Sequence, residues 1–307
     1  MKIVKTALEF SMLNSDDHNY VYLLGSWCLN KSENIFKDRE RFDIATYHWD
    51  DRKKYNYDYL YLTHVYEEKL TLLAPILNEI HSIEKDVRYW RIVLGPWLRF
   101  FIDALFDRYE CIKASQEYYK ASHYDLYPYK LNEWCPYDFT EFMDDLTSEE
   151  WNEIIFSECI VSQNIPFTIA KQPLSRSKKS TKESILFVDK WKDVVKWLSS
   201  KYSELLGPKY RGSVVVGSYS SFRTIFKLYL GLFQIPYFSL PIVKIKGSKV
   251  NKSMRRSLAI SQNSSGFEAV FEKLLPAMMP KIYLEDFAEL RAKISVRFPK
   301  KPKSIFT

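Results

Sequence analysis

The sequence predicts an α/β fold with many long helices. Residues 20–24 form a short β-type run that ends at Gly25 and Ser26, as the first strand of an α/β sheet does. Ligands of such sheets gather where parallel strands end, so Gly25 and Ser26 are predicted to contact a ligand, together with the Trp27 that follows them. Many turns of this kind bind nothing, which is the alternative for Gly25 and Ser26.

A second indication of parallel strands lies between residues 213 and 240. A β-type run beginning at Ser213 ends at Gly217 and Ser218, and a helical pattern at 222–233 and another apolar run follow. Strand, helix and strand in this order predict a right-handed crossover between parallel strands. Backbone amides at strand ends can meet an anion, so Gly217 and Ser218 are also predicted ligand contacts, with a plain turn as the alternative.

Long helical patterns supply most of the predicted secondary structure. One runs over residues 58–81, and shorter ones are expected at 184–206 and 284–294. A helix is also predicted to start at Thr147, which would act as its N-cap with Glu150 as the capping-box partner.

Residues 88–107 continue the helical pattern across Gly95 and Pro96. A single kinked helix and two separate helices are both consistent with a glycine stop and a first-turn proline. Trp90 and Trp97 share the apolar arc of this pattern, so both are predicted to pack in the core.

Three arginines in this segment, Arg88, Arg91 and Arg99, fall on a different arc from the tryptophans, with Gly95 among them. Guanidinium groups around a position without a side chain predict a binding site for a phosphate or a carboxylate. Salt bridges to Asp103, Asp107 or other acids are the alternative.

The segment HWDDRKK at residues 48–54 precedes the first long helical pattern. A partly desolvated carboxylate can take the proton from an acceptor hydroxyl, so Asp50 or Asp51 is the predicted general base, and His48 is a second candidate. The alternative for the aspartates is an ion-pair or capping cluster ahead of the helix, and for His48 a packed or hydrogen-bonded imidazole.

Trp27 and Trp49 fit no apolar stripe, so either is a candidate platform for a sugar ring, with a structural role as the alternative. Arg52 places a guanidinium beside the two aspartates and is a predicted substrate contact, with an ion pair as the alternative.

Composition excludes several classes of protein. Hydrophobic content of 46% with 16% aromatic residues excludes a disordered chain, and among only 8 glycines there is no P-loop and no dinucleotide-binding fingerprint. A net charge of +7 suits an anionic ligand or surface, but nucleic-acid binding is not expected. The basic stretch at 244–256 is either a solvated loop or a contact for lipid headgroups or an acidic acceptor.

The four cysteines lack CxxC spacing and the histidines lack metal-ligand spacing, so neither a zinc site nor a disulfide framework is predicted. No apolar run reaches the length of about 18 residues that a membrane span requires, and no signal peptide is evident. A cytoplasmic protein is expected, with a peripheral contact at the inner face of the membrane left open.

The segments LLGSWC (23–28), HWDDRKK (48–54) and RYWRIVLGPWLR (88–99) resemble a bacterial family of transferases of O-antigen and other surface-polysaccharide biosynthesis. The resemblance runs along the whole chain. It implies a GT-B-like glycosyltransferase, in which two Rossmann-like domains face a cleft and no metal ion is needed. The N-terminal domain of such enzymes handles the acceptor, and the C-terminal domain handles the nucleotide-sugar donor.

The resemblance also implies that the chain is a fragment, because members of the family continue into a donor-side region with a Gln-His-Gly type motif that does not occur here. Residues 1–300 are therefore predicted to form the N-terminal acceptor-side α/β domain. Residues 301–307 are predicted to be the hinge and first strand of a missing donor-binding domain.

The function implied by the resemblance is transfer of a hexosyl or acidic sugar from a nucleotide-sugar donor to a glycan or lipid-linked acceptor. No cofactor and no metal ion are expected. The alternative is a non-catalytic module that binds an acidic glycan or a protein partner through the arginine and tryptophan surface.

Overall fold

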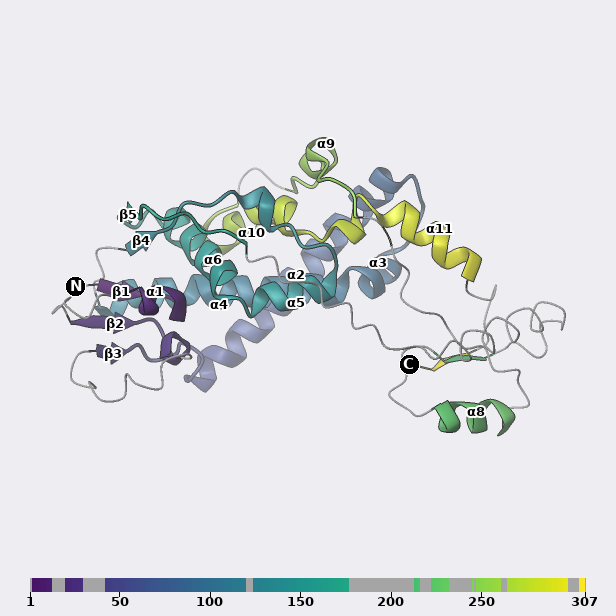
Figure 1. Ribbon diagram of the computed structural model, residues 1–307, viewed down its shortest axis with the longest axis horizontal. Coiled ribbons are helices and arrows are strands. Elements are labelled where there is room, and N and C mark those ends of the chain that lie inside the picture. The colour runs from purple at the N-terminus through teal and green to yellow at the C-terminus, as the bar shows by residue number, and fades with distance from the viewer. Residues whose placement is uncertain are drawn as a thin grey trace. The chain divides into compact units, whose positions relative to one another are not determined.

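A computed structural model describes residues 2–12, 20–29, 42–119, 124–176, 213–215, 222–231, 245, 247–260, 264–297 and 304–306 (Figure 1). The chain divides into two compact units. The first unit comprises residues 1–177 and 247–287, and the second comprises residues 178–246 and 288–307. This division differs from the predicted boundary near residue 300, and the predicted further domain beyond it stays a prediction.

The first unit contains a parallel sheet of strands β1 (Lys2–Val4), β2 (Val21–Leu23) and β3 (Phe42–Ile44), in the order β1-β2-β3. Strand β2 confirms the strand predicted at residues 20–24. Val4 and Leu23 are opposite each other and fully buried. All three strands run parallel. The carboxyl ends of all three strands therefore lie along one edge.

Two further strands, β4 (Tyr124–Leu126) and β5 (Phe167–Ile169), pair in parallel. Strand β4 lies beside β1, as Figure 1 shows, and the Lys5 amine at the end of β1 donates to the Asp125 carbonyl at 2.7 Å. The tyrosine-rich, proline-interrupted stretch at 118–137 predicts a long loop from the sequence alone, and that prediction is wrong for residues 124–126. Tyr124 and Leu126 alternate with Asp125 in burial, which is the period of a half-buried strand.

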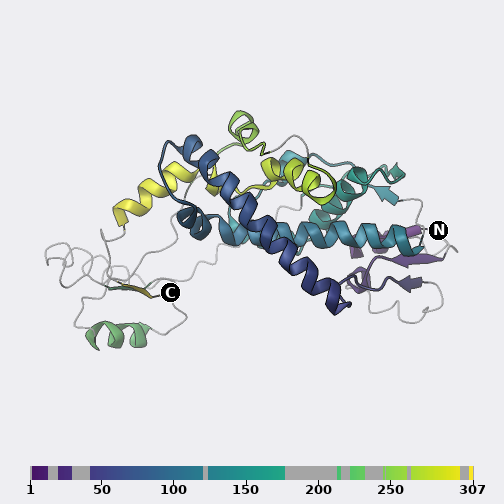
Figure 2. The same ribbon diagram turned by 180° about the vertical axis from the view of Figure 1, so that it is seen from behind.

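Three helices of the first unit arise from the long helical patterns: α2 (Arg52–His81), α3 (Val87–Val93) and α4 (Gly95–Tyr119). Figure 2 shows α2 crossing α4. The chain thus forms two helices around Gly95 and Pro96 rather than one kinked helix. Helix α2 begins at Arg52, ahead of the predicted start, because the Asp51 carboxylate accepts from the Lys53 amide at 2.8 Å and caps the helix.

Helix α4 forms the centre of the core, packed against α2, α6 (Glu149–Ser162) and α10 (Gly266–Met278). Trp90 and Trp97 are both fully buried, which confirms their predicted place in the core. Trp97 stacks on Phe101 with ring centroids 5.2 Å apart. Aromatic rings of this size bury far more apolar surface than aliphatic side chains, so they contribute much of the stability of this unit.

Shorter elements complete the first unit: α1 (Ala7–Ser11), η1 (Ser26–Leu29), η3 (Leu131–Trp134), α5 (Phe139–Leu146), α9 (Lys252–Arg256) and η5 (Lys281–Tyr283). The N-cap of α6 is Ser148, whose hydroxyl accepts from the Trp151 amide at 3.2 Å, so the prediction of Thr147 was one residue early. Within the basic stretch, Arg255 is buried and its Nε donates to Glu285 at 2.7 Å, so this residue is structural.

In the second unit, β6 (Ser213–Val215) pairs in parallel with β7 (Ser304–Phe306), and α8 (Phe222–Gly231) follows β6. These elements confirm the strand and the helix predicted after residue 213. Helix α11 (Phe287–Arg297) begins at the last residue of the first unit and confirms the last predicted helix. The helix predicted at 184–206 and the run at 235–240 lie outside the described residues. Among the described helices, none is both long and apolar enough to pass through a lipid bilayer.

The capping role of Asp51 gives a first prediction. Asp51→Ala removes the acceptor for the Lys53 and Lys54 amides and should lower the free energy of unfolding by about 1 kcal/mol, measured by urea denaturation. The neighbouring Asp50→Ala is the matched control and should change it by less than about 0.5 kcal/mol. Equal effects of the two substitutions would contradict the assignment of the cap.

Candidate functional site

A pocket of about 840 Å³ opens at the carboxyl ends of β1, β2 and β3. Parallel α/β sheets bind their ligands at this edge, because the loops that follow the strands converge there. The loops after the strands contribute Thr6, Gly25, Ser26, Trp27, Tyr47 and Asp50, helix α4 contributes Asp107 and Arg108, and the start of α6 contributes Glu149 and Asn152. Four of the predicted ligand contacts and catalytic candidates therefore meet here: Gly25, Ser26, Trp27 and Asp50.

Trp27 is fixed in the pocket wall by its neighbours. A Cβ atom at Gly25 would lie 2.1 Å from the Trp27 ring, so only glycine leaves room for the indole at this position. The indole Nε1 donates to the Lys5 carbonyl at 2.9 Å, and the ring meets Tyr47 edge-on with centroids 6.2 Å apart. The packing of Trp27 therefore explains the glycine at position 25, in addition to its place at a strand end.

The carboxylate of Asp107 accepts hydrogen bonds from three side chains. Its Oδ1 accepts from the Tyr47 hydroxyl at 2.5 Å and from His48 Nε2 at 3.1 Å, and its Oδ2 accepts from Arg108 Nη1 at 2.6 Å. Burial acts to raise the pKa of Asp107, but the hydrogen bond from His48 and the charge of Arg108 outweigh it and lower the pKa below its usual value. Since Asp107 is ionised, His48 Nε2 carries the proton in this bond.

Arg108 is held rigidly at the pocket. Besides its bond to Asp107, its Nε donates to Asn152 Oδ1 at 3.0 Å, and the Asn152 amide in turn donates to the Leu146 and Ser148 carbonyls at 3.1 and 2.8 Å. A guanidinium fixed on two sides presents its remaining N–H groups in one direction, which suits recognition of a hydroxyl or an anionic oxygen.

The residues of the segment 48–54 have different structural roles. Asp50 is exposed at the pocket, whereas Asp51 caps α2. His48 is buried and hydrogen-bonded to Asp107, which matches the alternative to its role as a base. Trp49 donates to Asp58 at 3.0 Å and stacks on Phe106, which places it in packing rather than in the pocket lining. Arg52, the first residue of α2, is exposed outside that lining.

The three arginines predicted to form an anion site do not line this pocket. Arg91 forms two bonds to the Glu67 carboxylate, and Arg99 donates to Asp103 at 2.8 Å and to the Thr63 hydroxyl. Both arginines thus make the salt bridges that were the alternative. Arg88 is exposed on α3.

The space predicted over Gly95 is occupied, because a Cβ atom there would lie 2.5 Å from the Tyr66 hydroxyl. Anion binding at the arginine face stays an untested prediction. Gly217 and Ser218, the other predicted anion contacts, lie outside the described residues.

A buried charge cluster lies directly behind the pocket. The Lys5 amine contacts Glu9 at 2.8 Å and Glu153 at 3.4 Å, and the Thr6 hydroxyl, which lines the pocket, donates to Glu153. Burial, which the charge of Lys5 opposes only in part, raises the pKa of Glu153 to about 7. The sequence carried no signal for this cluster, since Glu153 lies far along the chain from Lys5.

The chemistry of the pocket suits a polyhydroxylated ligand. Carboxylates at Asp50 and Glu149 accept from hydroxyl groups, Arg108 and Asn152 offer further polar contacts, and Trp27 supplies an aromatic surface. Sequence reasoning missed Arg108, Glu149 and Asn152 as site residues. Arg108 ends the arginine-rich stretch, but nothing local distinguished it from the arginines that form salt bridges.

Comparison with known proteins gives a single finding on the family. A family model described as LIC12162 family transferase matches residues 1–307, the entire chain. No curated protein and no solved structure matches the chain significantly.

The raised pKa of Glu153 predicts a pH dependence of stability. Between about pH 4.5 and 7, Glu153 keeps its proton in the folded chain but releases it in the unfolded chain. The free energy of unfolding should therefore fall as the pH rises through this range, by roughly 1 kcal/mol per pH unit. Glu153→Gln should remove this slope in urea denaturation at a series of pH values. Glu150→Gln, a half-buried position in the first turn of the same helix, is the control that should keep the slope. An unchanged slope in Glu153→Gln would refute the assignment.

Proposed function

We propose that this chain, which belongs to the LIC12162 family of transferases, is the acceptor-binding part of a GT-B-like glycosyltransferase of surface-polysaccharide biosynthesis, and that the pocket of the first unit holds the acceptor. The transferase family gives the reaction class. The observation that carries the finer proposal is the pocket itself, which combines an available carboxylate, a fixed guanidinium and an aromatic ring at one edge of a parallel sheet.

The order of the strands supports a Rossmann-like domain of this type. Strands β3, β2 and β1 are neighbours in this order (Figure 1). Strand β4 lies beside β1 and pairs with β5. β1 and β4 belong to two separate sheets, but this arrangement of neighbours resembles that of a doubly wound sheet, in which the strand order reverses between the first and the fourth strand. Ligands of such sheets bind in the crevice outside the carboxyl ends of the strands, which is where Thr6 and Gly25 line the pocket.

In the proposed reaction, Asp50 takes the proton from an acceptor hydroxyl, whose oxygen attacks the anomeric carbon of the donor sugar as the nucleotide diphosphate or monophosphate leaves. Arg108 and Asn152 orient the acceptor through its other hydroxyl groups, and Trp27 stacks on a sugar ring. Asp51 is unsuited to the role of base because its carboxylate caps α2.

The partners follow from the same proposal. The donor is a nucleotide sugar held by a further domain, and the acceptor is a glycan or a lipid-linked saccharide. The transfer step uses no organic cofactor and no metal ion. We expect the reaction on the cytoplasmic side of the membrane, where nucleotide sugars are supplied.

The test compares Asp50→Asn with Asp51→Asn in the intact protein that contains this chain. Nucleotide release is measured with a panel of uridine, guanosine, thymidine and cytidine nucleotide sugars. Asp50→Asn should lower turnover by about 10²–10⁴-fold without a matching change in stability, since it removes only the general base. Asp51→Asn should leave turnover within about twofold, because asparagine caps a helix as well as aspartate does.

Two outcomes would count against the proposal. Full turnover in Asp50→Asn would remove this residue as the base. A protein that binds glycans but releases no nucleotide from any donor would instead favour the non-catalytic binding module.

A further inference from the structure

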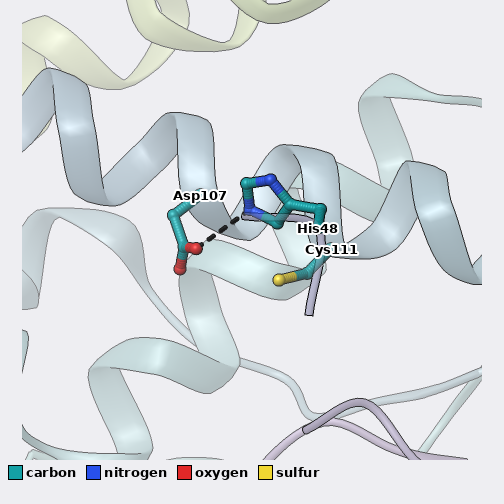
Figure 3. Close-up of side chains that lie close together, drawn as sticks. All are labelled: His48, Asp107 and Cys111. Carbon is teal, nitrogen blue, oxygen red and sulfur yellow. Dashed lines mark hydrogen bonds and ion pairs between the residues drawn. The ribbon is translucent and has the colours of Figure 1, made fainter. Parts of the chain in front are cut away.

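Three potential metal ligands meet where α4 passes behind the pocket. The imidazole nitrogen of His48, a carboxylate oxygen of Asp107 and the thiol sulfur of Cys111 all lie within 4.8 Å of one another, and all three residues are buried. Figure 3 shows the three side chains directed toward one space, with His48 Nε2 and Asp107 joined at 3.1 Å.

The fold, rather than a local motif, brings these residues together. Asp107 and Cys111 are four residues apart on α4 and therefore lie on one face of the helix. His48 comes from the loop after β3, which turns at the bond from the Asp50 amide to the Tyr47 carbonyl at 3.0 Å. A search for closely spaced cysteines and histidines overlooks such a site, which is why the sequence predicted no metal.

We propose that His48, Asp107 and Cys111 bind a divalent transition-metal ion, with Zn²⁺ as the best match. Nitrogen, oxygen and sulfur donors together suit zinc, whereas Mg²⁺ and Ca²⁺ prefer oxygen alone. Three protein ligands leave a fourth position for water. The pocket supplies that water through Asp107, which lines it.

The geometry requires only small adjustments of the side chains. Tetrahedral zinc with bonds of about 2.0–2.3 Å keeps its ligand atoms about 3.3–3.8 Å apart, so atoms that now lie within 4.8 Å of one another have to approach by about 1 Å at most. His48 Nδ1 has no hydrogen-bond partner among the described residues and points away from Asp107 and Cys111 in Figure 3. Asp107 is therefore the only hydrogen-bond partner of the ring among the described residues, and the ring also packs against Tyr47 and Trp49, so a small shift rather than a rotation has to bring Nε2 to the ion.

The charges also balance. On binding, Cys111 releases its thiol proton to solvent, and His48 binds as a neutral imidazole with its proton on Nδ1. The ion with one thiolate and one carboxylate then forms a neutral unit, and the partly exposed Arg108 keeps the one positive charge of the cluster. Arg108 remains on the other carboxylate oxygen and orients Asp107, as outer partners of metal ligands commonly do.

The inferred role of the ion is to fasten the loop that carries Tyr47 and Asp50 to α4. This inference does not depend on the proposed sugar transfer, and its test needs no substrate.

The test uses Co²⁺ as a spectroscopic substitute for Zn²⁺ on the chelator-treated 307-residue protein. Titration should produce a thiolate-to-cobalt charge-transfer band and visible bands of tetrahedral cobalt that saturate at a single equivalent. Cys111→Ser should abolish the charge-transfer band, and His48→Gln should weaken Co²⁺ binding at least tenfold. Added Zn²⁺, but not Mg²⁺, should remove the cobalt bands from the wild-type protein.

Cys28→Ser is the matched control. Cys28 is another buried thiol, and it donates to the Val4 carbonyl at 3.5 Å, which a serine hydroxyl can also do, so its substitution should leave the cobalt spectrum unchanged. Circular dichroism without metal establishes that each variant is folded, and if Cys111→Ser is not, His48→Gln decides the question. No charge-transfer band in the wild-type protein, the same band in Cys111→Ser, or unchanged binding in a folded His48→Gln would overturn the proposal.

Discussion

The first unit depends on one buried carboxylate, that of Asp107. It receives Tyr47 and His48 from the loop after β3, and it holds Arg108 from its own helix at the pocket. A buried negative charge is tolerated only when donors surround it, so the sheet edge and α4 have to meet in one arrangement. The same requirement makes the pocket rigid on this side. Loss of any one donor would leave the others around an undercompensated charge.

Features with a local physical cause were predictable from the sequence. Strand β2 and helix α2 follow from their apolar residues, and the burial of Trp90 and Trp97 follows from the apolar pattern of residues 88–107, although the two tryptophans lie on separate helices. Gly25 and Trp27 line the pocket, and they were noticed because a strand that stops at glycine marks a sheet edge. These predictions depend on neighbours within a few residues, where the chain's own geometry decides which side chains share a face.

Features that depend on distant parts of the chain were not predictable. Glu153 meets Lys5, and Asn152 meets Arg108, only after the helices pack, and no spacing in the sequence encodes either contact. The adjacent residues Asp50 and Asp51 show the same limit on a smaller scale: identical side chains differ in role because only Asp51 faces the free amides of α2. The arginines divide in the same way. Asp103, the partner of Arg99, lies four residues along the same helix and was named from the sequence, whereas Glu67, the partner of Arg91, comes from α2.

The complete burial of Lys5 has a consequence for solution chemistry. Its amine is enclosed by Glu9, Glu153 and the Asp125 carbonyl, so it is protonated and shielded from amine-reactive reagents in the folded chain. Most lysines are solvent-exposed and react at once. Slow labelling at Lys5 therefore measures how often β1 separates from α6 and exposes the wall behind the pocket, which makes this single side chain an intrinsic probe of local opening.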